Sequence, residues 1–274
     1  MLQDTLAALR KQAPLIHCIT NYVTANDCAN LLLACGASPV MADDPAEAAE
    51  IAAQSQGLLL NLGTLNQCTI PAMLAAGRQA NALGLPVVLD PVGAGASRLR
   101  SETAAMLLSE LRFAAIRGNS SEIKALATGS SATRGVDAAL SDQAPEDALG
   151  FAQEASRRWG AVVALTGPID IVAHGTQACL IQNGHPMMGR VTGTGCQLSA
   201  LTAAFLAANP GAPLEAVSAA VCAMGLCGEI AHRRLGRLEG NIAYRGRIID
   251  ALYRLTPERL AAGAKARFLP PQST

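Results

Sequence analysis

Short apolar runs alternate with longer segments of helical periodicity through the first 166 residues of the chain. The apolar runs are continuous, as in strands that are buried on both faces, and they cover residues 15–20, 38–42, 57–63, 86–92, 114–119 and 161–166. The segments between them have helical spacing and cover residues 26–35, 45–55, 68–83, 101–112, 120–127 and 145–159. This alternation predicts a three-layer α/β/α fold with a mostly parallel central sheet and helices on both faces.

The pattern changes after Thr166. Two short apolar runs, 169–174 and 178–182, are separated by a Gly175-Thr176-Gln177 turn and predict an antiparallel hairpin at a sheet edge. Beyond the hairpin, helical periodicity dominates from Thr194 to about Tyr253. The sheet is therefore expected to end in antiparallel strands, with the later helices packed over it.

Length and composition indicate one domain. The chain has 274 residues, half of them hydrophobic, and can bury a large core. No repeat or low-complexity linker divides it, so we expect a single domain over residues 1–268 and a disordered tail over 269–274, which contains two prolines. The apolar excess also suggests that part of the surface is buried between subunits of an oligomer.

Charge and cysteine usage narrow the class of partner. Lys and Arg number 21, as do Asp and Glu, so the chain lacks the basic field that nucleic acid or an anionic membrane requires. The eight cysteines form no CxxC pair and the N-terminus has no signal-peptide pattern, which favours a cytoplasmic location. The most apolar segments, 198–208 and 216–228, are interrupted before the roughly 20 residues of a membrane span and predict buried helices instead.

Candidate chemistry is expected where strands lead into helices, since ligands bind open α/β sheets at the carboxyl ends of the strands. The strongest signal is Val191-Thr192-Gly193-Thr194-Gly195-Cys196, which opens an apolar helix. Glycines allow a tight turn, and the free N–H groups and positive dipole end of the helix then form an anion hole for a transferred phosphoryl group. The alternative is an ordinary glycine turn in which Thr194 only caps the helix.

Cys196 falls in the first turn of that helix. The helix dipole is expected to lower its thiol pKa there, which suits a base or an orienting group beside an acceptor hydroxyl. The alternative is that Cys196 fills space like the other seven cysteines.

Two acidic residues are candidate metal ligands. Asp90 ends an apolar run and is followed by a Gly-rich loop, a suitable place to hold magnesium directly or through water, although it can also bond only local backbone amides. Glu122 follows Arg117 in Ile116-Arg117-Gly118-Asn119-Ser120-Ser121-Glu122 and can contact the same metal through its waters, while Arg117 can bind phosphate oxygens. Asn119 to Glu122 equally fits a capping box at a helix start.

Several weaker signals also follow strands. Thr166 can contact a nucleotide phosphate. Asn21 directly follows the first apolar run, and Met41 lies where the second strand is expected to end. The four histidines show neither metal spacing nor a partner, so structural roles are expected for them. The P-loop, the dinucleotide GxGxxG fingerprint and the GxSxG hydrolase elbow are absent from the sequence.

Taken together, these segments resemble the ribokinase-like superfamily, in which a GTGD-type turn forms the anion hole and N-x-x-E is a magnesium motif. The finer resemblance is to hydroxyethylthiazole kinases. It rests on ordered blocks that span most of residues 15–210: HCITNYVTANDCAN (17–30), ASPVMA (37–42), LNLGTL (60–65), VLDPVGAGAS (88–97), IRGNSSEI (116–123), ALTGPIDIV (164–172) and GTGCQLSALTAAF (193–205).

The resemblance implies a role for each candidate residue. Cys196 stands where most of the superfamily has Asp, as it does in hydroxyethylthiazole kinases, and becomes the catalytic residue. The resemblance also implies that Met41 and Gly193 contact the substrate, that Asn21 lies near its hydroxyl, that Arg117 and Thr166 bind ATP, and that Asp90 and Glu122 surround Mg²⁺. Thr194 and Gly195, at the helix N-terminus, are assigned to ATP as well.

The expected activity is ATP-dependent phosphorylation of 4-methyl-5-(2-hydroxyethyl)thiazole in thiamine salvage, by a homo-oligomer that family resemblance makes a trimer. One alternative is a hydroxymethylpyrimidine or pyridoxal kinase of the same fold, although such kinases usually carry Asp at the position of Cys196. Another, from a different class, is a nucleotide-binding protein that repairs nicotinamide cofactors or only binds its ligand.

Overall fold

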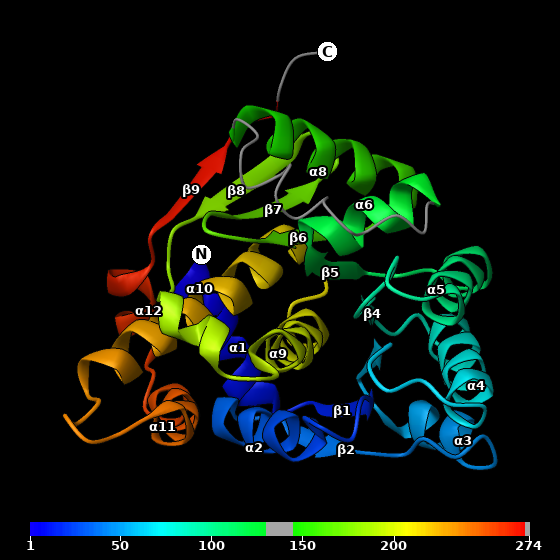
Figure 1. The fold of residues 1–274 in the computed structure, drawn as a ribbon, viewed down its shortest axis with the longest axis horizontal. Coiled ribbons are helices and arrows are strands. Elements are labelled where there is room, and N and C mark those ends of the chain that lie inside the picture. The colour runs from blue at the N-terminus through cyan, green and yellow to red at the C-terminus, as the bar shows by residue number, and fades with distance from the viewer. Residues whose placement is uncertain (130–144, 272–274) are drawn as a thin grey trace.

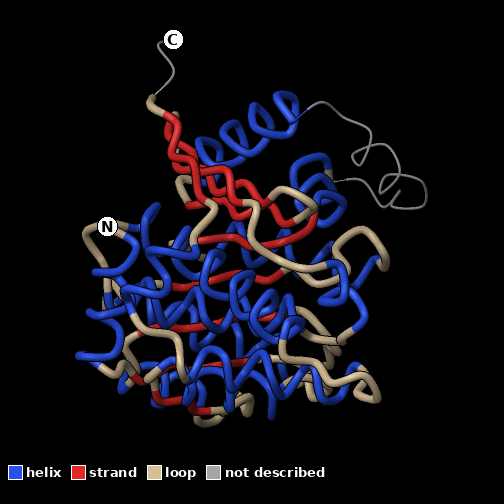
Figure 2. The backbone as a smooth tube through the Cα atoms, turned by 90° about the vertical axis from the view of Figure 1, so that its left-hand side faces the viewer, coloured by secondary structure: helices blue, strands red, loops and turns tan. Residues whose placement is uncertain are grey.

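The computed structural model describes residues 1–129 and 145–271, and this part of the chain forms a nine-stranded sheet. In spatial order the strands run β2-β1-β3-β4-β5-β6-β7-β8-β9. Figure 2 shows the strands in red, stacked from the top to the bottom of the view. The strands are β1 (Leu15–Ile19), β2 (Ser38–Val40), β3 (Gly57–Asn61), β4 (Val87–Asp90), β5 (Ala115–Asn119), β6 (Val162–Thr166), β7 (Asp170–His174), β8 (Gln177–Ile181) and β9 (Ala266–Leu269).

The first six strands pair in parallel, and the last three are antiparallel to their neighbours. The mostly parallel sheet predicted from the sequence is therefore confirmed, and each predicted strand is present with its ends shifted by at most two residues. Parallel pairing brings the carboxyl ends of β1, β3, β4, β5 and β6 to one edge of the sheet.

Helices cover both faces of the sheet (Figure 1). The described helices are α1 (Leu2–Gln12), α2 (Ala25–Cys35), α3 (Ala48–Gln54), α4 (Thr69–Ala82), α5 (Arg98–Glu110), α6 (Ser120–Thr128), α8 (Pro145–Trp159), α9 (Thr194–Ala208), α10 (Pro213–Arg233), α11 (Asn241–Tyr253), α12 (Pro257–Gly263) and the 3₁₀ helix η1 (Pro186–Arg190). One core lies between the sheet and α1, α2, α9, α10, α11 and α12, and the other lies under α3, α4, α5, α6 and α8.

Strand β3 shows why its apolar run is continuous. Leu58 and Leu60 point into one core and Leu59 into the other, and all three side chains are buried. Side chains alternate between the two faces of a strand, so a strand covered on both sides needs apolar residues at consecutive positions. The three-layer α/β/α architecture expected from the sequence is confirmed.

The two most apolar segments form core helices. Nearly every residue of α9 is buried, and α9 packs against β1, β3 and β4. Helix α10 is long and apolar enough by length and composition to cross a membrane, yet 83% of its most apolar window is buried inside the protein. Burial of this kind is typical of a central helix in a globular fold, as predicted for both segments.

The C-terminal region differs from the prediction. The hairpin of β7 and β8 is present, but β9 pairs with β8 and forms the sheet edge in its place. The predicted tail began at Leu269, whereas β9 extends through Leu269, and residues 272–274 lie outside the described part of the chain. Four residues are too few to show a clear hydrophobic periodicity in the sequence. Strand β9 forms because its backbone pairs with β8.

Candidate active site

The carboxyl ends of β5 and β6 and the N-terminus of α9 border a cavity of about 580 Å³. Its walls include Arg117, Thr166, Thr194 and Gly195, the four residues that the sequence analysis assigned to a nucleotide. Segments that are far apart in the sequence thus meet at one edge of the sheet, as expected for an open α/β fold.

The glycine turn at the start of α9 has the backbone that the anion-hole prediction requires. Gly193 is the N-cap residue with a φ of 84°, in the left-handed region that glycine tolerates best. A Cβ atom at Gly193 would lie 2.3 Å from Cγ2 of Thr24, so a side chain is also excluded by contact. No side-chain hydrogen bond caps the helix within the described residues, so its first N–H groups are left for a ligand.

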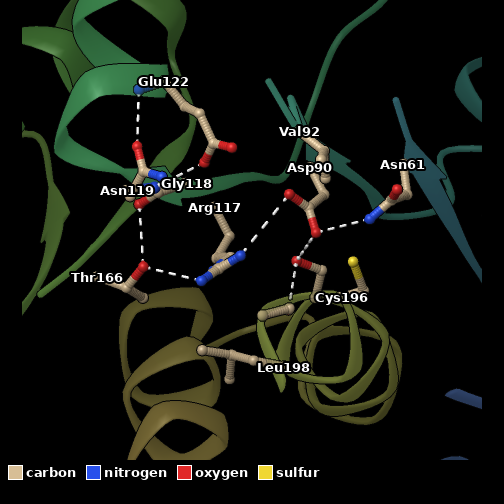
Figure 3. A network of polar contacts seen from close by, with 12 residues as sticks. Asn61, Asp90, Val92, Arg117, Gly118, Asn119, Glu122, Thr166, Cys196 and Leu198 are labelled. Carbon is tan, nitrogen blue, oxygen red and sulfur yellow. Dashed lines mark hydrogen bonds and ion pairs between the residues drawn. The ribbon is translucent and has the colours of Figure 1, made fainter. Parts of the chain in front are cut away.

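Arg117 lies between the end of β6 and the first turn of α9 (Figure 3). Its Nη2 donates a hydrogen bond of 2.9 Å to Oγ1 of Thr166, and its side chain is 13% exposed. A Cβ atom at Gly195 would lie 2.5 Å from Nη1, so the guanidinium packs directly on the helix backbone. A positive charge and free helix N–H groups are therefore adjacent in one wall of the cavity.

Asp90 is completely buried beside this guanidinium. Its Oδ2 accepts hydrogen bonds of 2.8 Å from Asn61 Nδ2 and from Ser199 Oγ, while Oδ1 lies 3.7 Å from Arg117 Nη1 and has no hydrogen-bond partner among the described residues (Figure 3). Burial raises the pKa of Asp90 to about 6, against the lowering effect of Arg117. The carboxylate is charged at neutral pH, and its Oδ1 atom faces Arg117 without a hydrogen-bond partner among the described residues.

Glu122 does cap the helix α6, as the plainer reading of its sequence motif predicted. Asn119 Oδ1 accepts a hydrogen bond from the Glu122 backbone N–H, and Glu122 Oε2 accepts one from the Asn119 backbone N–H. The other oxygen, Oε1, accepts a hydrogen bond of 2.9 Å from the Gly93 backbone N–H. Glu122 thereby joins the loop that follows Asp90 to the start of α6, and its charge raises the pKa of Asp90 further.

Cys196 lies on the opposite side of the α9 N-terminus from the nucleotide residues, next to Asn21. The Asn21 Nδ2 group donates to Cys196 Sγ at 3.3 Å and to Asn61 Oδ1 at 3.1 Å, while Asn21 Oδ1 accepts from Thr24. Burial, followed by the charge of Asp90, raises the pKa of the Cys196 thiol. The expectation of a lowered thiol pKa is wrong because these two effects outweigh the helix dipole.

Met41 is the one predicted site residue that the fold sets apart from the rest. It follows β2, is 39% exposed, and lines a second cavity of about 140 Å³ with Cys18, Thr20 and Tyr22. None of the other predicted site residues is among the described residues that line this cavity. The second cavity lies at the end of β1, close in sequence to Asn21.

Two residues that matter to this geometry were not predicted from the sequence. Ser199, which hydrogen bonds to Asp90, lies three residues after Cys196, a helical spacing that places both on one face of α9. Asp170 lies in the wall of the large cavity at the start of β7, and burial raises its pKa to about 6. The sequence carries a usable signal for Ser199 and none for Asp170, whose position depends on how β6 and β7 pair.

Comparisons with known proteins agree with this geometry. Residues 6–258 match the hydroxyethylthiazole kinase family. The chain is 54% identical over 269 residues to a hydroxyethylthiazole kinase from Clostridium acetobutylicum, which covers 97% of this chain and 98% of that protein. It superimposes on the hydroxyethylthiazole kinase structure from Pyrococcus horikoshii with a TM-score of 0.87 at 36% identity, covering 98% and 99% of the two chains.

A ribokinase-like superfamily protein from Enterococcus faecalis shares the fold alone, with a TM-score of 0.64 at 13% identity over 93% of this chain and 95% of that one. The ribokinase-like fold predicted from the sequence is therefore confirmed. The family match spans nearly the whole chain and includes every described residue that lines the large cavity, so the chain belongs to the hydroxyethylthiazole kinase family.

Proposed function

We propose that the chain transfers the γ-phosphoryl group of ATP to the hydroxyl of 4-methyl-5-(2-hydroxyethyl)thiazole, the step that feeds this alcohol into thiamine salvage. Membership of the family makes it a kinase. The observation that carries the proposal is the α9 N-terminus, which has Arg117 on one side and Cys196 and Asn21 on the other. Asp90 lies between them, beside Arg117 and linked through Asn61 to Asn21. Donor and acceptor can thus approach one anion hole from two sides.

The triphosphate is assigned to the large cavity. Arg117 offers a planar donor set that matches phosphate oxygens, and Thr166 holds it in place from the end of β6. The N–H groups at Thr194 and Gly195 add the positive end of the helix dipole. These groups are fixed before the substrate binds, so they stabilise the charge that develops during phosphoryl transfer with little reorganisation.

Asp90 and Glu122 are the proposed ligands of magnesium. No cluster of three or more His, Cys, Asp or Glu side chains that could hold a metal occurs among the described residues, which fits an ion that is bound mainly by ATP phosphates and water. The Oδ1 atom of Asp90 has no hydrogen-bond partner among the described residues, and Glu122 is close enough for its charge to raise the pKa of Asp90. When bound, magnesium neutralises charge on the phosphates that are being separated.

Cys196 and Asn21 are proposed to position the acceptor hydroxyl, with Gly193 at the substrate. The raised pKa keeps the Cys196 thiol neutral at pH 7, so it can donate or accept a weak hydrogen bond but supplies little thiolate as a base. Asn21 contacts Sγ directly and is fixed through Thr24. The rate is then expected to depend on orientation and anion stabilisation, as is usual for phosphoryl transfer.

Replacing Cys196 with serine is expected to lower kcat by about tenfold and to leave the KM for the thiazole within about twofold. The hydroxyl is smaller than the thiol and shifts the position of the acceptor. Steady-state kinetics at saturating ATP checks this result. Cys35→Ser is the matched control, because Cys35 is buried in α2 and its Sγ donates to the Leu32 carbonyl. Equal turnover in the wild type and Cys196→Ser would return Cys196 to the role of core filler.

Replacing Glu122 with glutamine is expected to raise the magnesium concentration for half-maximal turnover by about tenfold, because the charge near the metal is lost. Glutamine can still accept the Asn119 backbone N–H as in a capping box, but it loses the hydrogen bond from the Gly93 backbone N–H, so a stability cost of about 1–2 kcal/mol is expected beside the magnesium effect. Magnesium titrations of turnover and thermal unfolding measure the two effects.

Asn119→Ala provides the control for the Glu122 variant, because it removes the cap oxygen and keeps the charge. It should lower stability by about 1 kcal/mol and leave the magnesium requirement unchanged. If Glu122→Gln changes only stability, then Glu122 is a capping residue and has no part in metal binding.

The exposed apolar side chains beside the second cavity support an oligomer. Tyr22 is 81% exposed, Val23 55% and Met41 39%, and Tyr22 and Met41 line the second cavity. Large side chains gathered in this way are typical of a surface that another subunit covers. We propose that Met41 reaches the thiazole in a homotrimer through this surface.

The cytoplasmic location remains a prediction, with which the free state of all eight cysteines agrees.

One assay tests the proposed function. Purified protein is incubated with magnesium-ATP and, separately, with hydroxyethylthiazole, hydroxymethylpyrimidine and pyridoxal, and the products are detected by mass. Phosphorylation of the thiazole alone supports the proposal. Phosphorylation of only another alcohol would overturn the substrate, and no product from any alcohol would favour a cofactor-repair or binding role.

A further inference from the structure

The large cavity has two kinds of wall. Arg117, Thr166 and the start of α9 form the polar wall described above. Opposite in character is an apolar wall from the segment that includes η1 and from the middle of α10, which contribute His185, Pro186, Met188, Val221 and Met224. The turn from β6 to β7, with Asp170, completes the lining. A site that combines fixed polar groups with an apolar surface is typical of pockets for small ligands, and a volume of about 580 Å³ lies within their usual range.

The His185 ring in this apolar wall is backed by a second ring. His185 stacks on His232, with ring centroids 3.5 Å apart and planes inclined by 20°. His232 in turn meets the edge of Tyr244, whose centroid lies 6.5 Å away. Tyr244 is completely buried and its hydroxyl donates to the Gly228 carbonyl at 3.0 Å. The three rings thus lie in a row, with the exposed His232 between the buried Tyr244 and His185 at the cavity.

The orientation of His185 is fixed by a second contact. It is the N-cap residue of η1, and its Nδ1 accepts a hydrogen bond of 3.2 Å from the Met187 backbone N–H. One face of the ring is taken by His232, which is absent from the described residues that line the cavity. His185 itself lines the cavity, so its remaining surface is what a ligand meets.

Glu229 holds the backbone before His185 against α10. Its Oε1 accepts hydrogen bonds of 3.1 Å from the Gly184 backbone N–H and 3.0 Å from Asn183 Nδ2, and it also contacts Lys265 Nζ at 3.0 Å. Asn183 Oδ1 accepts from the Lys265 backbone N–H. The segment leading to His185 is therefore anchored to α10 and to the start of β9, so the ring does not have to be ordered when a ligand binds.

We propose that the base of the nucleotide stacks on His185, and that His232 acts as a positioning residue behind it. This inference rests on the proposed function, because it requires the triphosphate to bind at Arg117 in the same cavity. Bases stack readily on aromatic side chains, histidine included, with little dependence on sequence or exocyclic groups. This proposed role differs from the structural role expected for His185 from the sequence.

Two substitutions at position 185 separate stacking from capping. His185→Asn keeps a good N-cap acceptor and loses the ring, whereas His185→Phe keeps a ring and loses the acceptor. Isothermal titration with ATP should give binding about tenfold weaker for His185→Asn and within about twofold of wild type for His185→Phe. The KM for ATP should rise in His185→Asn while kcat stays close to wild type.

Other variants extend the test. His232→Ala should weaken ATP binding less than His185→Asn does, since the ring that meets the base remains. His174→Ala is the matched control, because His174 ends β7 and is not among the described residues that line the cavity, and it should bind ATP as the wild type does. Thermal unfolding of each variant shows that it is folded.

Three results would overturn the inference. If His185→Asn binds ATP as tightly as the wild type, or if His185→Phe is the weaker of the two, then His185 acts only as a cap. A fall in kcat equal to the rise in KM would place His185 in the transfer step instead. If the unaltered protein binds no ATP at all, the proposed function fails and this inference falls with it, an outcome distinct from the other two.

Discussion

Replacing Gly195 with alanine is expected to lower kcat by on the order of 10²–10³ while the protein stays folded. Gly195 is a helical residue, so alanine fits its backbone, and alanine favours a helix by up to about 1 kcal/mol over glycine. The added Cβ, however, would lie 2.5 Å from Arg117 Nη1. The flexible guanidinium moves away, and the anion hole loses its positive charge.

Kinetics and thermal unfolding of Gly195→Ala check this prediction together. Gly246→Ala is the matched control, because Gly246 lies within α11 and a Cβ there meets no described atom within 4 Å. A double-mutant cycle with Arg117→Ala identifies the cause, since Gly195→Ala should cost little more once Arg117 is absent. Normal turnover in Gly195→Ala would show that the position of Arg117 does not matter for transfer.

Replacing Asp90 with asparagine is expected to lower kcat/KM for magnesium-ATP by on the order of 10² or more. The amide keeps the shape of the side chain and can still accept from Asn61 and Ser199. It removes the negative charge that faces Arg117 and is proposed to bind magnesium. Kinetics at several magnesium concentrations measure the loss, and near-normal activity at low magnesium would remove Asp90 from the metal site.

The same variant should change how stability depends on pH. Burial raises the pKa of Asp90 to about 6 from an ordinary value of 3.8, so between these pH values the folded state holds a proton that the unfolded state releases. The contribution of this group to stability is therefore present below pH 4 and is lost as the pH rises through about 6, by roughly 2–3 kcal/mol. Urea unfolding at pH 4.5 and 7 should show a smaller fall in Asp90→Asn than in the wild type.

Most of the fold could be predicted because its elements depend on local pattern. Continuous apolar runs marked the six parallel strands. Helix α9, which follows Gly193, begins at Thr194, where helical periodicity was predicted to start. The N-terminal helix α1, the short α12 and the edge strand β9 were not predicted. Strand β9 has four residues and is only partly buried, so it depends on β8 for its hydrogen bonds.

Most residues of the candidate site could be named from the sequence, whereas Ser199, Asp170 and the electrostatics of the site were not. Cys196 was expected to have a lowered thiol pKa from its place in the helix alone, and the structure reverses the direction through burial and the charge of Asp90. Glu122 satisfied its capping box as its spacing predicted. The capping box depends on Asn119 and Glu122, which are three residues apart. The pKa of the Cys196 thiol, in α9, depends on the carboxylate of Asp90, which lies on β4 and is distant in the sequence.

The sequence by itself determined the order of the elements, the loops that carry the site, and the glycine turn at Gly193, because each is set by residues close together in the chain. The tertiary structure alone decided that Asp90 is fully buried against Ser199, 109 residues away, and that His185 lies in the wall of the same cavity as Arg117. Burial and charge depend on which segments meet in space. A pattern read along one segment contains no information about its neighbours in space.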